Sequence, residues 1–238
     1  MRPSRSRPTA RRTYGYRRSS ILTALSNAAL LLLVTGAVSW EAIRRLQHPE
    51  PVIATTIIWV AALGILINGA TAMMFFAGRA HDVNIRGAFM HMAADALEAL
   101  GVVIAGLAIR WTGKLWIDPA VSIAIGVVII FGTWGLLRES VNLAMDAVPS
   151  HIDPAEVEAF LTTVPGVQGV HDLHIWAMST TETAMTAHLV VPSGELSDAQ
   201  LRAAADVLRD RFKIGHCTIQ PEPGDGAHPC AQESSAAV

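Results

Sequence analysis

Charged side chains are scarce in this sequence. Asp, Glu, Lys and Arg make up 16% of its 238 residues and hydrophobic residues make up 51%, whereas about a quarter of an average soluble globular protein is charged. This shortage argues against an ordinary soluble protein and favours one that lies in a membrane. The charges are also segregated, because seven arginines precede the first acidic residue and most acidic residues follow Glu139.

Cysteine is scarce as well. The two cysteines, Cys217 and Cys230, do not form a Cys-x-x-Cys pair, so a disulfide framework is not expected and a reducing compartment is permitted. The sequence also lacks a His-Glu-x-x-His pattern and an accompanying nucleophile, which argues against a membrane metalloenzyme. We expect neither a catalytic cofactor nor a nucleic-acid partner.

Long apolar segments dominate the first two thirds of the chain. After a basic segment (1–18), transmembrane helices are predicted at residues 19–43, 52–77, 84–110 and 117–143 of a membrane domain spanning 19–148. Each segment has the roughly 20 apolar residues that cross a bilayer, and the first is too long for a signal peptide. The basic N-terminus, Arg79, Arg86 and Arg138 would lie inside, so we expect a multi-pass protein of the cell (inner or plasma) membrane with both termini cytoplasmic.

A soluble domain is predicted at residues 150–222. Helix starts at Asp153-Pro154 and Ser197, two strands at 169–178 and 183–191, and a short strand at 216–220 give the order α-β-β-α-β. This order is typical of a small α+β sandwich, which gains from pairing with a second copy. Residues 223–238 are rich in Gly, Pro and Ser, which predicts a disordered tail.

The third apolar segment contains His91 and Asp95. Their spacing of four places both side chains on one helix face, and an acidic residue in a membrane marks a functional site because its burial is costly. Imidazole nitrogen and carboxylate oxygen suit zinc, and they are compatible with cadmium, cobalt or iron. Glu98 lies near the same face, either as a proton carrier or at the rim.

Histidines also gather in the soluble domain. With the hairpin turn centred between Thr180 and Thr181, His188 lies opposite Leu173 and diagonal to His171. A slip of one residue would pair His188 with His174 instead. Solvated surface histidines remain the alternative to a metal site.

Six motifs together resemble, in order and spacing, the cation diffusion facilitator family, especially its bacterial zinc and cadmium efflux members. They are residues 13–18 (Thr-Tyr-Gly-Tyr-Arg-Arg), 41–45 (Glu-Ala-Ile-Arg-Arg), 84–88 (Asn-Ile-Arg-Gly-Ala), 91–95 (His-x-x-x-Asp), 118–119 (Asp-Pro) and 170–176 (Val-His-Asp-Leu-His-Ile-Trp). The resemblance implies a ferredoxin-like or metallochaperone-like cytoplasmic domain. It also implies a homodimer that exchanges a divalent cation for protons by alternating access.

The resemblance further implies roles for individual residues. His91 and Asp95 correspond to one half of the family's transport site, and His171, His188 and Glu222 correspond to cytoplasmic metal ligands. The family has six membrane helices, and the first two have no counterpart here, so we expect a truncated family member. The alternative is a transport-incompetent, membrane-anchored subunit that binds metal and regulates.

Overall fold

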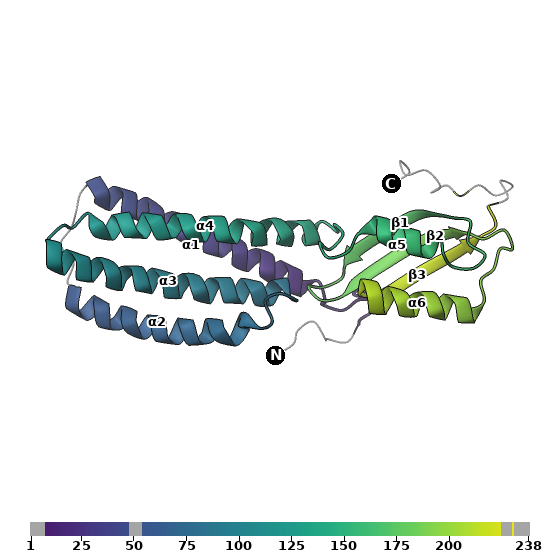
Figure 1. Cartoon of the computed structure of the whole chain (residues 1–238), viewed down its shortest axis with the longest axis horizontal. Coiled ribbons are helices and arrows are strands. Elements are labelled where there is room, and N and C mark those ends of the chain that lie inside the picture. Colours follow the sequence, from purple (N-terminus) through teal and green to yellow (C-terminus); the bar gives the residue numbers. More distant parts are fainter. Residues whose placement is uncertain (1–7, 48–53, 225–229, 231–238) are drawn as a thin grey trace. The chain divides into compact units, whose positions relative to one another are not determined.

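The structure, a computed structural model, describes residues 8–47, 54–224 and 230. The chain divides into two compact units, which are described separately. One unit is Ser20–Val141, and the other combines Met1–Ser19 with Asn142–Val238. Long apolar helices in the first and a small α+β domain in the second confirm the predicted fold class (Figure 1).

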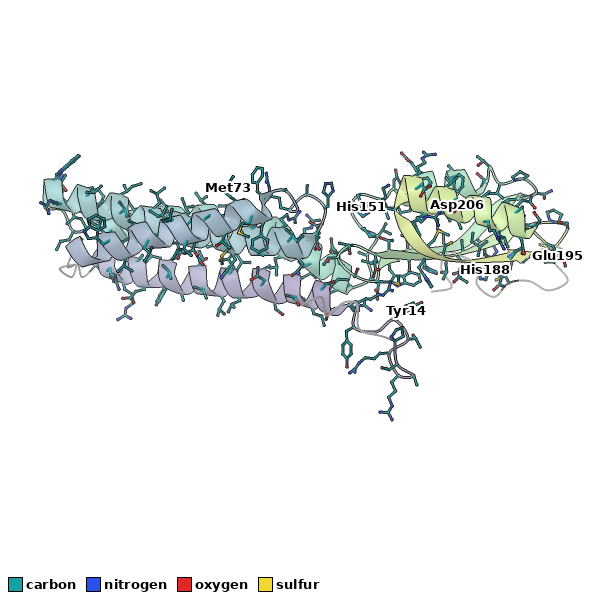
Figure 2. All side chains as sticks on the ribbon, turned by 90° about the horizontal axis from the view of Figure 1, so that it is seen from below. Tyr14, Met73, His151, His188, Glu195 and Asp206 are labelled. Carbon is teal, nitrogen blue, oxygen red and sulfur yellow. The ribbon has the colours of Figure 1, made fainter. Side chains whose placement is uncertain are left out.

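The membrane unit is built on four long helices, labelled in Figure 1: α1 (Ser19–Gln47), α2 (Ala54–Phe76), α3 (Val83–Thr112) and α4 (Ile117–Ala144). All four contain a stretch long and apolar enough to cross a membrane. Their outer surfaces carry large apolar side chains, among them Met73, which is labelled in Figure 2 and is 69% exposed. Such a surface is suited to lipid rather than to water.

The helix that carries His91 and Asp95 packs against the other three. Leu31 of α1, Ala94 of α3 and Ile129 of α4 form a buried cluster. On the α2 side, Gly64 faces α3, and an added Cβ would lie in van der Waals contact, 3.6 Å from the Cβ of Ala99. Small residues at such contacts let membrane helices approach one another.

Local signals define the two ends of α3. The Asp82 side chain accepts a hydrogen bond of 2.8 Å from the Asn84 backbone N–H, which caps the first turn. At the other end Gly113 adopts a left-handed conformation (φ 71°) and its N–H donates to the Ile109 carbonyl. The helix is therefore slightly longer than the predicted 84–110.

The second unit holds the small α+β domain, in which the observed elements follow the expected α-β-β-α-β order. They are α5 (Pro154–Leu161), β1 (Gly169–Ala177), β2 (Thr183–Val190), α6 (Asp198–Phe212) and β3 (Ile214–Glu222). The sheet order is β1-β2-β3, with β1 and β2 antiparallel and β2 and β3 parallel. Strand β3 is longer than the predicted 216–220, and the predicted disordered tail lies outside the described residues except for residues 223, 224 and 230.

The core of this domain lies between the sheet and its two helices. Met185, Ala187 and Leu189 of β2 join Leu161 of α5 and Leu208 of α6 in one buried cluster. Because side chains alternate across a strand, the residues between them on β2 point to the other face of the sheet. His188 is one of these, so it faces away from α5 and α6.

The basic N-terminal segment contacts this domain within the same unit. Arg17 pairs with Glu182 at 2.9 Å between Nη1 and Oε2, and Arg18 pairs with Asp146. The Tyr14 ring meets the His216 ring edge-on at 5.7 Å between centroids. The two ion pairs are largely exposed, so each contributes little to stability.

Candidate metal centres

The membrane candidate is the His91–Asp95 pair on α3. His91 Nε2 lies 3.8 Å from Asp95 Oδ2, and about a third of each side chain is exposed. The other ring nitrogen, His91 Nδ1, is buried and has no hydrogen-bond partner among the described residues. A nitrogen and an oxygen so arranged can provide two of the four ligands that zinc takes.

Glu98 extends the same face of α3. It lies three residues after Asp95 and seven after His91, spacings that return to one side of a helix. Its side chain is partly buried. The face thus carries two carboxylates and one imidazole, a donor set suited to a divalent cation.

A β-bulge determines the second candidate, which lies in the α+β domain. His171 pairs directly with His188, and the register shifts between His171 and His174, so that His174 pairs with Thr186. Asp172 lies within the bulge in a left-handed conformation (φ 51°). Both registers considered from the sequence are therefore wrong, because an uninterrupted hairpin ladder cannot include the extra residue of a bulge.

The bulge brings two imidazoles to one carboxylate. The rings of His171 and His188 lie 5.1 Å apart between centroids, and His171 Nε2 contacts Glu222 Oε1. His188 Nδ1 lies 3.5 Å from Glu222 Oε2. Glu222 reaches this position because β3 runs parallel to β2 and pairs Gln220 with His188, which leaves Glu222 two residues further along the strand.

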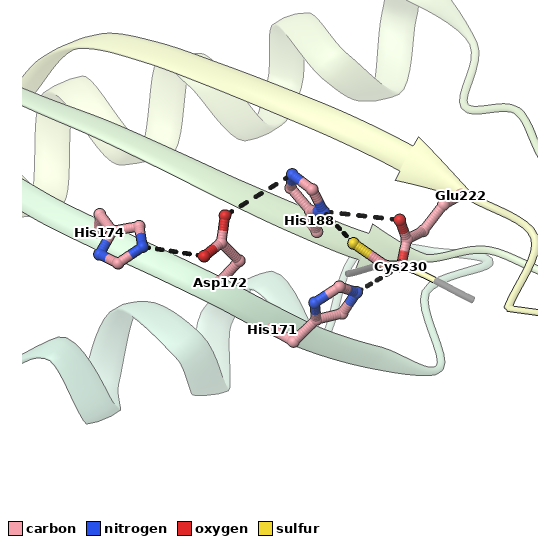
Figure 3. Close-up of polar contacts among 6 residues, drawn as sticks. All are labelled: His171, Asp172, His174, His188, Glu222 and Cys230. Atoms are coloured by element: carbon pink, nitrogen blue, oxygen red, sulfur yellow. Dashed lines mark hydrogen bonds and ion pairs between the residues drawn. The ribbon is translucent and has the colours of Figure 1, made fainter. Parts of the chain in front are cut away.

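Cys230 joins these three residues, as Figure 3 shows. Its Sγ lies 3.3 Å from His188 Nδ1. Each of the four side chains offers one donor atom, and these atoms all lie within 4.8 Å of one another. In tetrahedral zinc sites, ligand bonds of about 2.0–2.3 Å place the donors roughly 3.3–3.8 Å apart, so small side-chain rotations suffice to fit an ion here.

Two members of this region differ from the sequence-based expectation. Asp172 was not expected at the site, yet its Oδ1 lies 2.9 Å from His174 Nε2 and its Oδ2 lies 3.7 Å from His188 Nε2 (Figure 3). Regular strand alternation would place Asp172 on the opposite face, so the sequence pattern carried no signal for it. His174 itself lies outside the four-donor group.

Comparison with known proteins identifies the family. Residues 1–143 match the family model of the cation efflux transmembrane domain, and residues 149–224 match that of the cation efflux protein cytoplasmic domain. This chain belongs to the cation efflux family. The family consists of metal cation transporters rather than enzymes, so the predicted class is confirmed and this family member is a multi-pass membrane protein.

Several curated relatives of this cation efflux protein share about a third of its sequence. The cation efflux system protein CzcD of an Alcaligenes strain is 37% identical over 227 residues, covering 95% of this chain and 71% of the relative. The zinc transporter ZitB of Escherichia coli is 35% identical over 221 residues, 92% of this chain and 70% of the relative. The metal-bound C-terminal domain of the Cupriavidus metallidurans CzcD transporter is 39% identical and covers 30% of this chain and 99% of that domain, with a TM-score of 0.28.

Proposed function

We propose that this chain exports zinc from the cytoplasm in exchange for protons by alternating access. The observation that carries the proposal is the His91–Asp95 pair, held at 3.8 Å on a helix long and apolar enough to span a membrane. An ionisable pair in that position is costly to insert unless it serves a function. Relatives named as zinc transporters, and as a cadmium, cobalt and zinc/H(+)-K(+) antiporter, support the same substrate class.

In this proposal, His91 and Asp95 have different roles in the exchange of the cation for protons. The Asp95 carboxylate offsets part of the charge of a divalent cation, and the His91 imidazole binds it only when the nitrogen is unprotonated. Histidine titrates near neutral pH, so protons from the far side of the membrane can displace the cation. Cadmium, cobalt and iron(II) accept the same donors, and we propose zinc because tetrahedral nitrogen and oxygen coordination suits it.

The cytoplasmic cluster would serve this cycle as a metal sensor. In this proposal His171, His188 and Glu222 bind the cation on the cytoplasmic side, in a domain that pairs with that of a second copy. The domain has fewer than 80 residues, a size that gains stability from association. Basic residues in short loops favour the cytoplasmic side of a membrane. The basic N-terminus, Arg79, Arg86 and Arg138 would share one side, which supports placing both termini in the cytoplasm.

Transport by the full chain in proteoliposomes tests the proposal. A zinc-sensitive dye inside the vesicles would report uptake driven by an imposed pH gradient. Replacing His91→Ala or Asp95→Ala should abolish uptake, whereas the exposed loop variant His81→Ala should transport normally. Uptake undiminished in both α3 variants would refute the proposed site.

A regulatory, metal-binding subunit is the second candidate. One observation favours it: among the described residues the cytoplasmic cluster unites four donors, whereas the His91–Asp95 pair on α3 supplies two. In that case the wild-type chain would bind zinc but give no uptake. Zinc binding would then be lost on replacing His188 and retained on replacing His91.

A further inference from the structure

We propose that the Cys230 thiolate is the fourth ligand of the cytoplasmic site, which makes that site selective for thiophilic ions such as cadmium and zinc. This inference rests on the metal-binding role proposed for His171, His188 and Glu222. It adds a ligand of a different chemical class, and with it a specificity that the three other residues do not supply.

The geometry around His188 supports the assignment. Cys230 Sγ lies 3.3 Å from His188 Nδ1, and that same nitrogen lies 3.5 Å from Glu222 Oε2. Sulfur and carboxylate therefore approach one ring nitrogen together. An ion placed between them would exchange these contacts for bonds of about 2.0–2.3 Å.

Burial favours a bound ion at this position. The side chains of His171, His188 and Glu222 are only 13%, 11% and 18% exposed, and Cys230 is half-buried. Converging donors in such a site lose much of their hydration, and a bound cation compensates for that loss by coordinating them. Carboxylate and thiolate together carry two negative charges, which match one divalent cation.

A turn that favours glycine follows the end of β3, next to Glu222. Just beyond β3, Gly224 has a φ of 63°, and a Cβ there would collide with the Val190 side chain. Glycine has no Cβ and tolerates this conformation. The backbone can therefore turn two residues after Glu222, beside Val190 of β2.

The donor chemistry determines which ions fit. Two imidazoles, a carboxylate and a thiolate form a borderline-to-soft set, which favours zinc and cadmium over magnesium, calcium and manganese. His91 and Asp95 in the membrane offer no sulfur. The cytoplasmic site should consequently discriminate for cadmium more strongly than the transport site does.

The second cysteine provides a matched control. Cys217 lies on β3 but packs against the domain core formed with α5 and α6, and it is not a member of the four-donor group. Its replacement by serine removes a thiol from the same domain without changing the proposed ligand set.

The test uses the full-length chain in detergent, titrated with cobalt(II) and then with cadmium(II). Thiolate coordination produces a sulfur-to-metal charge-transfer band in the ultraviolet, and nitrogen or oxygen ligands do not. We expect this band in the wild type and in Cys217→Ser, and its loss in Cys230→Ser. Cadmium affinity of the cytoplasmic site should fall roughly 100- to 1,000-fold in Cys230→Ser. This is the factor expected when a four-ligand site loses one of its ligands.

The outcomes separate this inference from the proposed function. A wild type that binds cadmium without the band, or a Cys230→Ser variant that keeps the band and the affinity, would overturn the role of Cys230 and leave the three other ligands in place. The band should persist in a His91→Ala, Asp95→Ala double variant, because the transport site contains no thiol. A wild type that shows the band but gives no zinc uptake would thus count against the proposed function alone.

Discussion

Replacing His188 with alanine should remove the centre of the cytoplasmic cluster. His188 is 9% exposed, and its ring contacts Glu222, Cys230 and Asp172. The matched control is His174→Ala, which removes an imidazole from β1 that lies outside the four-donor group. The two variants lose the same side chain from the same sheet and differ in whether a metal ligand is lost.

The expected magnitude follows from the number of donors. A four-ligand zinc site binds with roughly 10–16 kcal/mol, so one ligand accounts for about 2.5–4 kcal/mol, or roughly two to three decades in Kd. At a zinc concentration of 100 times the wild-type Kd, the metal stabilises the wild-type domain by about 2.7 kcal/mol. A His188→Ala variant with a 100-fold weaker site would gain only about 0.4 kcal/mol at the same concentration.

Hydrogen exchange measured by mass spectrometry on the full chain reports this stabilisation for the domain separately. Amides of β2 that exchange by domain opening should slow about 100-fold with zinc in the wild type and in His174→Ala, and about twofold in His188→Ala. Equal slowing in His188→Ala and the wild type would refute the assignment of His188 as a ligand. Greater loss in His174→Ala would transfer the role to His174.

Three further predictions concern the same domain. Asp172→Asn should weaken zinc binding roughly 10- to 100-fold, because outer carboxylates orient metal-bound histidines; competition with a chelating dye measures this, and an unchanged Kd would argue against such a role. Leu208→Ala should lower the free energy of unfolding by about 2–5 kcal/mol because Leu208 is fully buried. Arg202 is exposed, so Arg202→Ala should change the free energy of unfolding by less than about 0.5 kcal/mol. Urea titrations of both variants measure the two values. Burial raises the pKa of the Cys217 thiol. In a Cys230→Ser background, alkylation of Cys217 by iodoacetamide should therefore accelerate only at a higher pH than alkylation of free cysteine, whose pKa is about 8.5. A pH profile that matches free cysteine would contradict the burial argument.

Much of the architecture follows from the sequence alone. The four long apolar segments must cross the membrane as helices, because backbone N–H and C=O groups in lipid have to form their hydrogen bonds within the segment. Caps such as Asp153 and Ser197 locate helix starts to within a few residues, because they act through neighbours in the chain. The His91–Asp95 pair was identifiable for the same reason, because helical spacing places residues four apart on one face.

The cytoplasmic site depended on the tertiary structure. Its candidate ligands come from β1, β2, the end of β3 and residue 230, so their meeting depends on strand register. A bulge at Asp172 changes that register by one residue, and period-two alternation in the sequence contains no trace of it. The sequence by itself thus determined the spanning helices and placed His91 and Asp95 on one helix face, whereas only the folded sheet decided that His171 rather than His174 faces His188 and that Cys230 lies beside them.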